Sequence, residues 1–133
     1  MSLAKKIDHV AIAVKDLDAA VQTFTGNFGF PIERIGEVPA LNIRRAYLTI
    51  GDAWIELFQP TSDANPGSKF IAERGEGMYV LSLEVDDLQV AAQALSEKGM
   101  TVNVQQIPNG PRLGFISPKA THGVLLQLIE HPH

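Results

Sequence analysis

The sequence predicts an α+β fold made of two tandem βαβββ modules, whose strands form a curved, barrel-like mixed sheet around a central pocket, with the helices outside. Two internal alignments support this prediction. Residues 7–17 align with residues 78–88, and Ile55-Glu56-Leu57 aligns with Leu126-Gln127-Leu128, both at the same offset along the chain. Repetition at a fixed offset indicates a duplicated structural unit. Each copy also shows one helical pattern followed by three strand patterns.

The first half of each module has the pattern of a strand followed by a helix. Apolar residues alternate with other residues near 7–14 and 78–85, which predicts the two strands. Asp16 and Asp87 then stand where helix N-caps are expected. Apolar side chains recur at helical spacing after these caps, namely Leu17, Ala20, Val21 and Phe24 in the first copy and Leu88, Ala91, Ala92 and Leu95 in the second. A glycine follows each helix and predicts its end.

Three further strands complete each module. They are predicted near 32–38, 43–50 and 53–59 in the first copy and near 101–107, 112–117 and 123–130 in the second. We therefore expect module one at about 5–61, a linker at about 62–76 and module two at about 77–131, together forming a single domain over residues 1–133. A short helix is expected inside the linker, near 68–74.

The composition is that of an ordinary globular protein, 45% hydrophobic and 20% charged, with a net charge of −4. The lack of a basic cluster argues against nucleic acid and anionic membranes as partners. No stretch approaches the ~20 apolar residues that a membrane helix needs. The absence of cysteine excludes thiolate metal sites and a cysteine nucleophile. The absence of cysteine and the lack of a secretory signal pattern together predict a cytoplasmic location.

Strand alternation predicts which side chains face the pocket. In the first strand Val10, Ile12 and Val14 are expected to pack under the helix, which leaves His9 and small residues on the opposite face. The side chains expected on that face combine aromatic rings with a few polar groups, as ligand cavities do. They are His9, Arg45, Tyr47, Trp54, Glu56, Phe58, Val80, Ser82, Phe115 and Gln127.

Several segments carry a family resemblance. They are Ile7-Asp8-His9-Val10-Ala11-Ile12 at the start, Gly51-Asp52 with Ile55-Glu56-Leu57-Phe58, residues 69–78, and Ser117-Pro118-Lys119 followed by Gly123-Val124-Leu125-Leu126. Over nearly the whole chain these segments resemble the vicinal oxygen chelate superfamily, which includes glyoxalases, extradiol dioxygenases, bleomycin-resistance proteins and methylmalonyl-CoA epimerases. The resemblance is greatest to the epimerases and to glyoxalase-like proteins. It implies isomerase or lyase chemistry on a small carbonyl compound or an acyl thioester.

The resemblance also implies a divalent metal site, formed by one residue from the first and the last strand of each module. The matching positions here are His9, Glu56, Val80 and Gln127. His9 and Glu56 fit this pattern. Val80 stands where epimerases have a histidine and cannot bind metal, while Gln127 replaces a glutamate and offers only a neutral carbonyl oxygen. We therefore expect His9, Glu56 and Gln127 to hold a divalent ion weakly or not at all, and we expect no other cofactor.

Arg45 falls near the position where the resemblance places a second catalytic carboxylate. A guanidinium there can stabilise an oxyanion or anchor a carboxylate or phosphate. Glu56 is then the obvious base, so Glu56 and Arg45 are the predicted catalytic residues. The alternatives are a purely structural Glu56–Arg45 ion pair and an exposed Arg45, since Arg44 and Arg45 are adjacent and one of them must point outward.

The remaining predicted pocket residues are Tyr47, Trp54, Phe58, Val80, Ser82, Phe115 and His122. The aromatic members have an alternative role as ordinary core, and His122 as a solvated turn residue. His131 and His133 are expected to be disordered because they lie near the terminus.

Three interpretations stay open from the sequence. The first is an enzyme of the glyoxalase or methylmalonyl-CoA epimerase kind. The second is a binding protein of the bleomycin-resistance kind, which sequesters a small aromatic or amphiphilic compound. The third is a degenerate relative whose pocket is filled by its own side chains. The expected partners are a small-molecule ligand and a second copy of the chain, because members of the superfamily commonly form homodimers.

Overall fold

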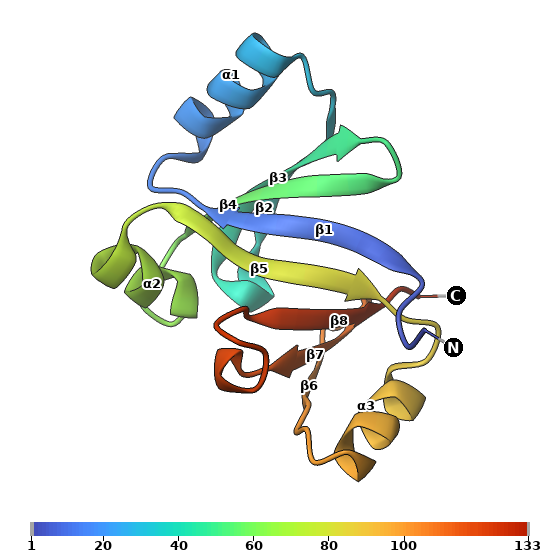
Figure 1. Ribbon diagram of the computed structural model, residues 1–133. Coiled ribbons are helices and arrows are strands. Elements are labelled where there is room, and N and C mark those ends of the chain that lie inside the picture. Colours follow the sequence, from blue (N-terminus) through green and yellow to red (C-terminus); the bar gives the residue numbers. More distant parts are fainter. Residues whose placement is uncertain (1, 133) are drawn as a thin grey trace. The chain divides into compact units, whose positions relative to one another are not determined.

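The computed structural model describes residues 2–132 and contains the predicted succession of strands and helices (Figure 1). The chain divides into two compact units. We call residues 9–79 the N-terminal unit, and residues 80–132 together with residues 2–8 the C-terminal unit. Within the described residues, each helix is too short or too polar to span a bilayer.

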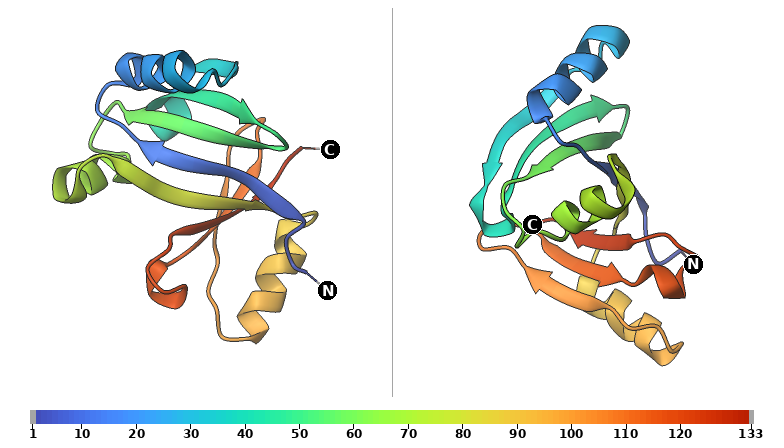
Figure 2. Two further views of the ribbon diagram at one scale, coloured as in Figure 1. Left: turned by 45° about the horizontal axis from the view of Figure 1, so that its top comes forward. Right: turned by 90° about the vertical axis from the view of Figure 1, so that its left-hand side faces the viewer.

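The N-terminal unit holds a mixed four-stranded sheet. Its elements are β1 (Lys6–Ala13, of which the first three residues belong to the other unit), α1 (Leu17–Phe28), β2 (Ile32–Val38), β3 (Ile43–Ile50), β4 (Ala53–Pro60) and α2 (Pro66–Arg74), with a 3₁₀ turn at Pro39–Leu41. The strand order is β2-β3-β4-β1. Neighbouring strands are antiparallel except β1, which runs parallel to β4. Helix α1 packs against β3 and β4, and Figure 2 (left) shows it lying over one face of these strands.

The C-terminal unit repeats this arrangement. Its elements are β5 (Gly77–Glu84, which begins in the other unit), α3 (Leu88–Glu97), β6 (Asn103–Gln106), β7 (Arg112–Ile116) and β8 (Leu126–Glu130), with a 3₁₀ turn at Pro118–Ala120. The strand order is β5-β8-β7-β6, with β8 parallel to β5 and the other pairs antiparallel. Helix α3 packs against β7 and β8. The prediction of two tandem βαβββ modules with mixed pairing is therefore confirmed.

The predicted start of the last strand is wrong. The sequence predicts a strand over 123–130, but β8 begins only at Leu126. His122 and Gly123 adopt positive φ angles of 59° and 92°. This left-handed backbone continues a turn instead of an extended strand, and glycine adopts it without steric cost.

Each unit buries the apolar face of its own helix. Leu17 of α1 and Leu88 of α3 are fully buried, at positions that the internal repeat aligns. The N-terminal core is formed by Val14, Leu17, Ala46, Leu48 and Leu57, and the C-terminal core by Val85, Leu88, Ala91, Ile116 and Leu128. Burying a leucine side chain stabilises a fold by about 1.5–3 kcal/mol. The duplication is therefore a duplication of the core as well as of the strand pattern.

The helix N-termini are capped in the same way in both units. Asp16 accepts a hydrogen bond from the backbone N–H of Ala19, and Asp87 accepts one from Val90, both at 3.1 Å. An aspartate in extended backbone conformation satisfies one of the unpaired amides of the first helical turn. Both predicted N-caps are thus confirmed.

The last strand of each unit also contacts the helix N-terminus. Gln59 Oε1 accepts a hydrogen bond from the backbone N–H of Leu17 at 2.9 Å, and Glu130 Oε1 accepts one from Leu88 at 2.8 Å. Gln59 and Glu130 occupy equivalent positions in the two copies of the repeat. Each unit therefore ties its first helix to its last strand through one side-chain oxygen.

This contact predicts the effect of truncating Glu130. The variant Glu130→Ala leaves the Leu88 amide without its side-chain acceptor and should lower the free energy of unfolding by about 1–2 kcal/mol. Glu130→Gln should lose less, because Gln59 shows that an amide oxygen serves at the equivalent position. Urea denaturation of the three proteins measures the difference. Equal losses for alanine and glutamine would mean that the carboxylate charge, and not the hydrogen bond, is the stabilising feature.

Tyr79 forms an aromatic cluster within the N-terminal unit. Its ring makes edge contacts with Phe58 and Phe70, with centroid separations of 5.4 and 5.1 Å. Burial raises the pKa of the Tyr79 phenol above its ordinary value of 10.0. The folded chain therefore holds this proton more tightly than the unfolded chain does.

A raised phenol pKa predicts loss of stability in alkali. Below about pH 10 the proton is bound in both states, and above it the unfolded chain releases the proton first, so the free energy of unfolding falls as pH rises. In Tyr79→Phe this contribution is absent, so the fall in the free energy of unfolding above about pH 10 should be shallower than in the parent. Urea midpoints measured across this range test the difference. Parallel curves for the two proteins would contradict it.

Candidate functional site

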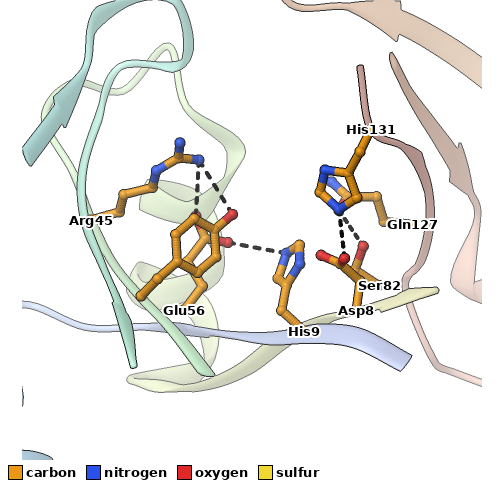
Figure 3. A network of polar contacts seen from close by, with 8 residues as sticks. Asp8, His9, Arg45, Glu56, Ser82, Gln127 and His131 are labelled. Atoms are coloured by element: carbon orange, nitrogen blue, oxygen red, sulfur yellow. Dashed lines mark hydrogen bonds and ion pairs between the residues drawn. The ribbon is translucent and has the colours of Figure 1, made fainter. Parts of the chain in front are cut away.

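A buried carboxylate lies at the centre of a polar cluster in the N-terminal unit (Figure 3). Glu56 Oε1 lies 3.4 Å from His9 Nε2, and Glu56 Oε2 lies 3.6 Å from Arg45 Nη1. Arg45 Nη1 also lies 3.5 Å from the Tyr47 hydroxyl, and the Tyr47 ring makes an edge contact with His9. We call His9, Arg45, Tyr47 and Glu56 the Glu56 cluster.

Strand register brings the cluster together. Glu56 of β4 lies opposite Tyr47 of β3 and opposite Ala11 of β1. Directly opposed residues in neighbouring strands share one face of a sheet, and so do residues two apart along a strand. His9 is two residues from Ala11, and Arg45 is two residues from Tyr47. The small Ala11 side chain leaves room for the imidazole and the carboxylate on this face.

Glu56 is held by charge more than by short hydrogen bonds. It is 7% exposed and His9 is 2% exposed, so both polar groups need partners to offset the loss of water. The Glu56 carboxylate lies 3.4 Å from His9 and 3.6 Å from Arg45. Both distances are longer than the roughly 2.7–3.2 Å of good N–H···O hydrogen bonds. With 7% of its surface exposed, Glu56 is not completely shut off from solvent. A carboxylate in this state can accept a proton.

The two adjacent arginines point to opposite sides of β3. Arg44 Nη2 lies 3.6 Å from Asp18 of α1, whereas Arg45 faces Glu56 and is 22% exposed. The Arg45 guanidinium lies 4.8 Å from the centroid of the Tyr47 ring, and that of Arg34 lies 5.3 Å from the same centroid. Two guanidinium groups therefore lie against the Tyr47 ring, and one of them, that of Arg45, also pairs with Glu56.

The C-terminal unit contains an uncharged pair at the equivalent place. The Ser82 hydroxyl donates a hydrogen bond to Gln127 Oε1 at 2.7 Å, and Ser82 lies directly opposite Gln127 in the β5–β8 pairing. Phe115 of β7 lies opposite Gln127 on the other side. Ser82 and Gln127 thus occupy, in the second copy of the repeat, the positions of Ala11 and Glu56 in the first.

The prediction that His131 is disordered is wrong, while His133 lies outside the described residues. His131 Nε2 lies 2.6 Å from Asp8 Oδ1, and Asp8 is 1% exposed (Figure 3). The signal for this pair is present in the sequence. Asp8 shares the strand parity of Val10 and Ile12, and a carboxylate on an apolar face needs a partner. Arg34 is a second residue that the sequence does not indicate, and its guanidinium faces the Tyr47 ring. Strand alternation alone does not show which side chains of an edge strand fold back over the sheet.

The other predicted pocket residues lie in different surroundings. Trp54 lies beside Tyr47, with ring centroids 6.0 Å apart. Phe58 is buried between Tyr79 and Gly67, where a Cβ atom would lie only 2.6 Å from the Phe58 ring. Val80 is buried, and His122 is exposed in the turn before β8. Whether these residues contact a ligand stays a prediction.

The donor atoms do not fit a divalent ion in either unit. In the N-terminal unit His9 and Glu56 face each other, and the Arg45 cation lies against the same carboxylate, where it would repel a metal. In the C-terminal unit Val80 has no donor, and the Gln127 oxygen is occupied by the Ser82 hydroxyl. Over residues 2–132 no three histidine, aspartate or glutamate side chains form a metal-binding group.

Comparisons with known proteins agree with this architecture. The model of the family described as "Glyoxalase/Bleomycin resistance protein/Dioxygenase superfamily" matches residues 8–116. The chain is 28% identical to an ethylmalonyl-CoA/methylmalonyl-CoA epimerase of Cereibacter sphaeroides, over 92% of this chain and 96% of that protein. The crystal structure of methylmalonyl-CoA epimerase from Mycobacterium tuberculosis superposes with a TM-score of 0.92 and 30% identity, over 100% of this chain and 92% of that one.

A ligand-bound structure is also similar. It is a methylmalonyl-CoA epimerase in complex with methylmalonyl-CoA and NH4+, with a TM-score of 0.88 and 30% identity, covering 97% of this chain and 95% of that one. The similarity therefore extends over whole chains and includes a structure that holds an acyl-CoA thioester.

The buried Asp8–His131 pair predicts a stability effect. His131→Ala leaves the Asp8 carboxylate without this partner and should lower the free energy of unfolding by about 1–2 kcal/mol, a value reduced because the imidazole is partly exposed. Asp8→Asn combined with His131→Ala should cost less than the sum of the two single changes. Urea denaturation of the cycle measures the coupling. Strict additivity would mean that the pair contributes nothing.

Proposed function

Because the chain belongs to the Glyoxalase/Bleomycin resistance protein/Dioxygenase superfamily, we propose that it is an enzyme that moves a proton at the carbon next to the carbonyl of an acyl-CoA thioester. The observation that carries this proposal is the Glu56 cluster, where a nine-tenths-buried carboxylate lies 3.6 Å from a guanidinium. This arrangement supplies a base and a fixed positive charge at one place.

The proposed step uses these two groups. Glu56 takes the α-proton, so that the C–H bond breaks and an O–H bond forms on the carboxyl group. The electron pair moves into the carbonyl, and the Arg45 guanidinium stabilises the negative oxygen of the resulting enolate. Return of the proton to carbon restores the thioester with exchange of the α-hydrogen, and the centre is inverted where the proton is delivered to the opposite face of the enolate. Arg45 keeps donors beyond Nη1 for this task, because its contacts with Glu56 and Tyr47 both involve Nη1.

The arrangement supports a metal-independent form of this chemistry. Glu56 already pairs with both His9 and Arg45, so the positive charge beside the enolate is proposed to come from Arg45. Sequestration of an apolar compound is the less favoured function, since the named relatives are epimerases and the cluster is charged. A homodimer and a cytoplasmic location are further parts of the proposal, and light scattering tests the first.

Exchange of the α-hydrogen in D2O tests the proposed reaction. Methylmalonyl-CoA and propionyl-CoA are incubated with chelator-treated protein, and deuterium incorporation is followed by mass spectrometry. We expect exchange by the parent and a loss of about 100-fold or more in Glu56→Gln, which keeps the side-chain shape but removes the base. Arg45→Met should lose about 100-fold, and Arg45→Lys should retain part of the rate, because a lysine keeps the charge without the planar fork.

Arg44→Met is the matched control. Arg44 lies next to Arg45 in sequence but faces Asp18 of α1, so its loss should leave exchange within about 2-fold of the parent. Exchange that survives in Glu56→Gln would remove Glu56 as the base. Exchange that disappears with chelator and returns with Mn²⁺ or Co²⁺ would overturn the metal-independent mechanism.

A further inference from the structure

Inversion of the α-carbon requires a second proton-transfer group beside Glu56. A proton that Glu56 removes and returns arrives on the face of the enolate from which it came. A planar enolate is inverted only when the new proton reaches the opposite face. The second group must therefore carry an exchangeable proton and lie within reach of the same carbon.

The Tyr47 hydroxyl meets the distance requirement within the N-terminal unit. It lies 3.5 Å from Arg45 Nη1, and Glu56 Oε2 lies 3.6 Å from the same nitrogen. Two groups that transfer protons to opposite faces of one carbon stand roughly 6–7 Å apart, since each approaches the carbon to about 3–3.5 Å. Two oxygens that both contact one nitrogen at these distances cannot be separated by much more than this. One α-carbon can therefore lie within reach of both groups.

The contact with Arg45 also affects where the phenol hydrogen points. A guanidinium only donates hydrogen bonds, so the Tyr47 oxygen is the acceptor in this contact. The phenol hydrogen is consequently not used there and points away from the guanidinium. Tyr47 is partly exposed, and the Arg45 side chain beside it is 22% exposed. The hydroxyl therefore combines a transferable hydrogen with a position that is open to a ligand.

Two cations stabilise the phenolate that forms when Tyr47 gives up its proton. The guanidinium carbons of Arg45 and Arg34 lie 4.8 and 5.3 Å from the centroid of the Tyr47 ring. When the enolate is protonated, Glu56 already carries the α-proton and is neutral. The charge of Arg45 is then no longer balanced by the carboxylate. Positive charge beside a developing anion lowers the barrier of the step that forms it.

His9 is the other proton carrier of the Glu56 cluster, and its position suits this role less well. The residue is 2% exposed, and its Nε2 lies 3.4 Å from Glu56 Oε1. A proton that leaves this nitrogen goes to the carboxylate and not to a substrate carbon. The imidazole instead packs against the Tyr47 ring, with centroids 5.6 Å apart, and holds it in place.

We propose that Tyr47 is a second catalytic residue, which delivers a proton to the enolate on the face opposite Glu56. The O–H bond of Tyr47 breaks and a C–H bond forms at the α-carbon, while the enolate electron pair returns to carbon and the carbonyl is restored. Glu56 then loses its proton to water, and the phenolate regains one from water. Arg34 is a positioning residue that acts through the Tyr47 ring. This inference rests on the proposed function for the reaction and adds the inverting step.

Propionyl-CoA in D2O tests the number of faces that are protonated, because its α-carbon carries two hydrogens. If Glu56 alone returns the deuteron, one hydrogen is replaced again and again and the other is never reached. If the deuteron comes from the opposite face, the remaining hydrogen turns toward Glu56 and is replaced in the next turnover. We expect the chelator-treated parent to incorporate two deuterium atoms, as followed by mass spectrometry.

Tyr47→Phe is the decisive variant. It keeps the ring that packs against His9 and Arg45 but has no proton to give. The ratio of the second deuterium uptake rate to the first should fall about 100-fold, which is the usual contribution of a positioned acid. Continued uptake of the first deuterium shows that the variant is folded and that Glu56 is active. An unchanged ratio would mean that another donor reaches the second face.

Tyr79→Phe is the matched control. It removes the other of the two tyrosine hydroxyls of the chain, whose ring packs against Phe58 and Phe70, so the ratio should stay at the parental value. Arg34→Met should lower the ratio about 10-fold, and Arg34→Lys should lower it less, because lysine keeps the positive charge. An unchanged ratio in Arg34→Met would overturn the role given to Arg34.

The outcomes separate this inference from the proposed function. Two deuterium atoms in the parent and one in Tyr47→Phe support both. A single deuterium in the parent, or two at the parental ratio in Tyr47→Phe, overturns the role of Tyr47 and leaves the proposed reaction standing. Loss of both uptakes in a Tyr47→Phe protein with a parental urea midpoint assigns Tyr47 to proton removal and also overturns the inference. No uptake by the parent overturns the reaction and the role of Tyr47 together.

Discussion

The placement of Glu56 in the middle of a sheet is the constraint around which the N-terminal unit is arranged. A carboxylate that is 7% exposed requires compensation, and it receives this from Arg45 on one side and His9 on the other. Tyr47 packs against both of these partners. Because the compensation comes from ion pairs longer than ordinary hydrogen bonds, the carboxylate is held in place while its oxygens stay available. This combination is required of a base in a largely apolar setting.

The duplicated modules have diverged in chemistry at corresponding positions. Ala11 and Glu56 in the N-terminal unit become Ser82 and Gln127 in the C-terminal unit, in the same strand pairing. One unit offers an acid–base group with compensating charge, and the other offers a neutral hydroxyl–amide pair. The Ala11–Glu56 pair and the Ser82–Gln127 pair cannot exchange roles. The amide of Gln127 does not accept a proton at neutral pH. Glu56, in turn, requires a cationic partner, which the Ser82–Gln127 pair does not include. A duplicated module therefore carries different functional groups in its two copies.

Sequence reasoning predicted the modules, the helix caps and the residues of the Glu56 cluster, because all of these follow from local periodicity and from the constant offset of the internal repeat. Features that depend on side-chain reach could not be predicted in the same way. The direction of the Gln127 amide is set by a hydroxyl on another strand, and the ordering of His131 is set by Asp8, which lies near the opposite end of the chain. The start of β8 was missed because His122 adopts a positive φ, which is uncommon for a residue other than glycine.

The opposite orientations of Arg44 and Arg45 depend on the register between β3 and β4. These strands pair from Ile43 with Pro60 to Ile50 with Ala53, and Gly51 bends the chain with a φ of 53°. Side chains alternate between the two faces of a strand with a period of two. An insertion of one residue in β3 would therefore turn Arg45 away from Glu56 and place Arg44 on the face that carries Glu56, at a shifted position along the strand. The segment after β4 contributes no residue to the Glu56 cluster, so a change in its length leaves the β3–β4 register unaltered. A one-residue change within β3, by contrast, alters which side chains face Glu56.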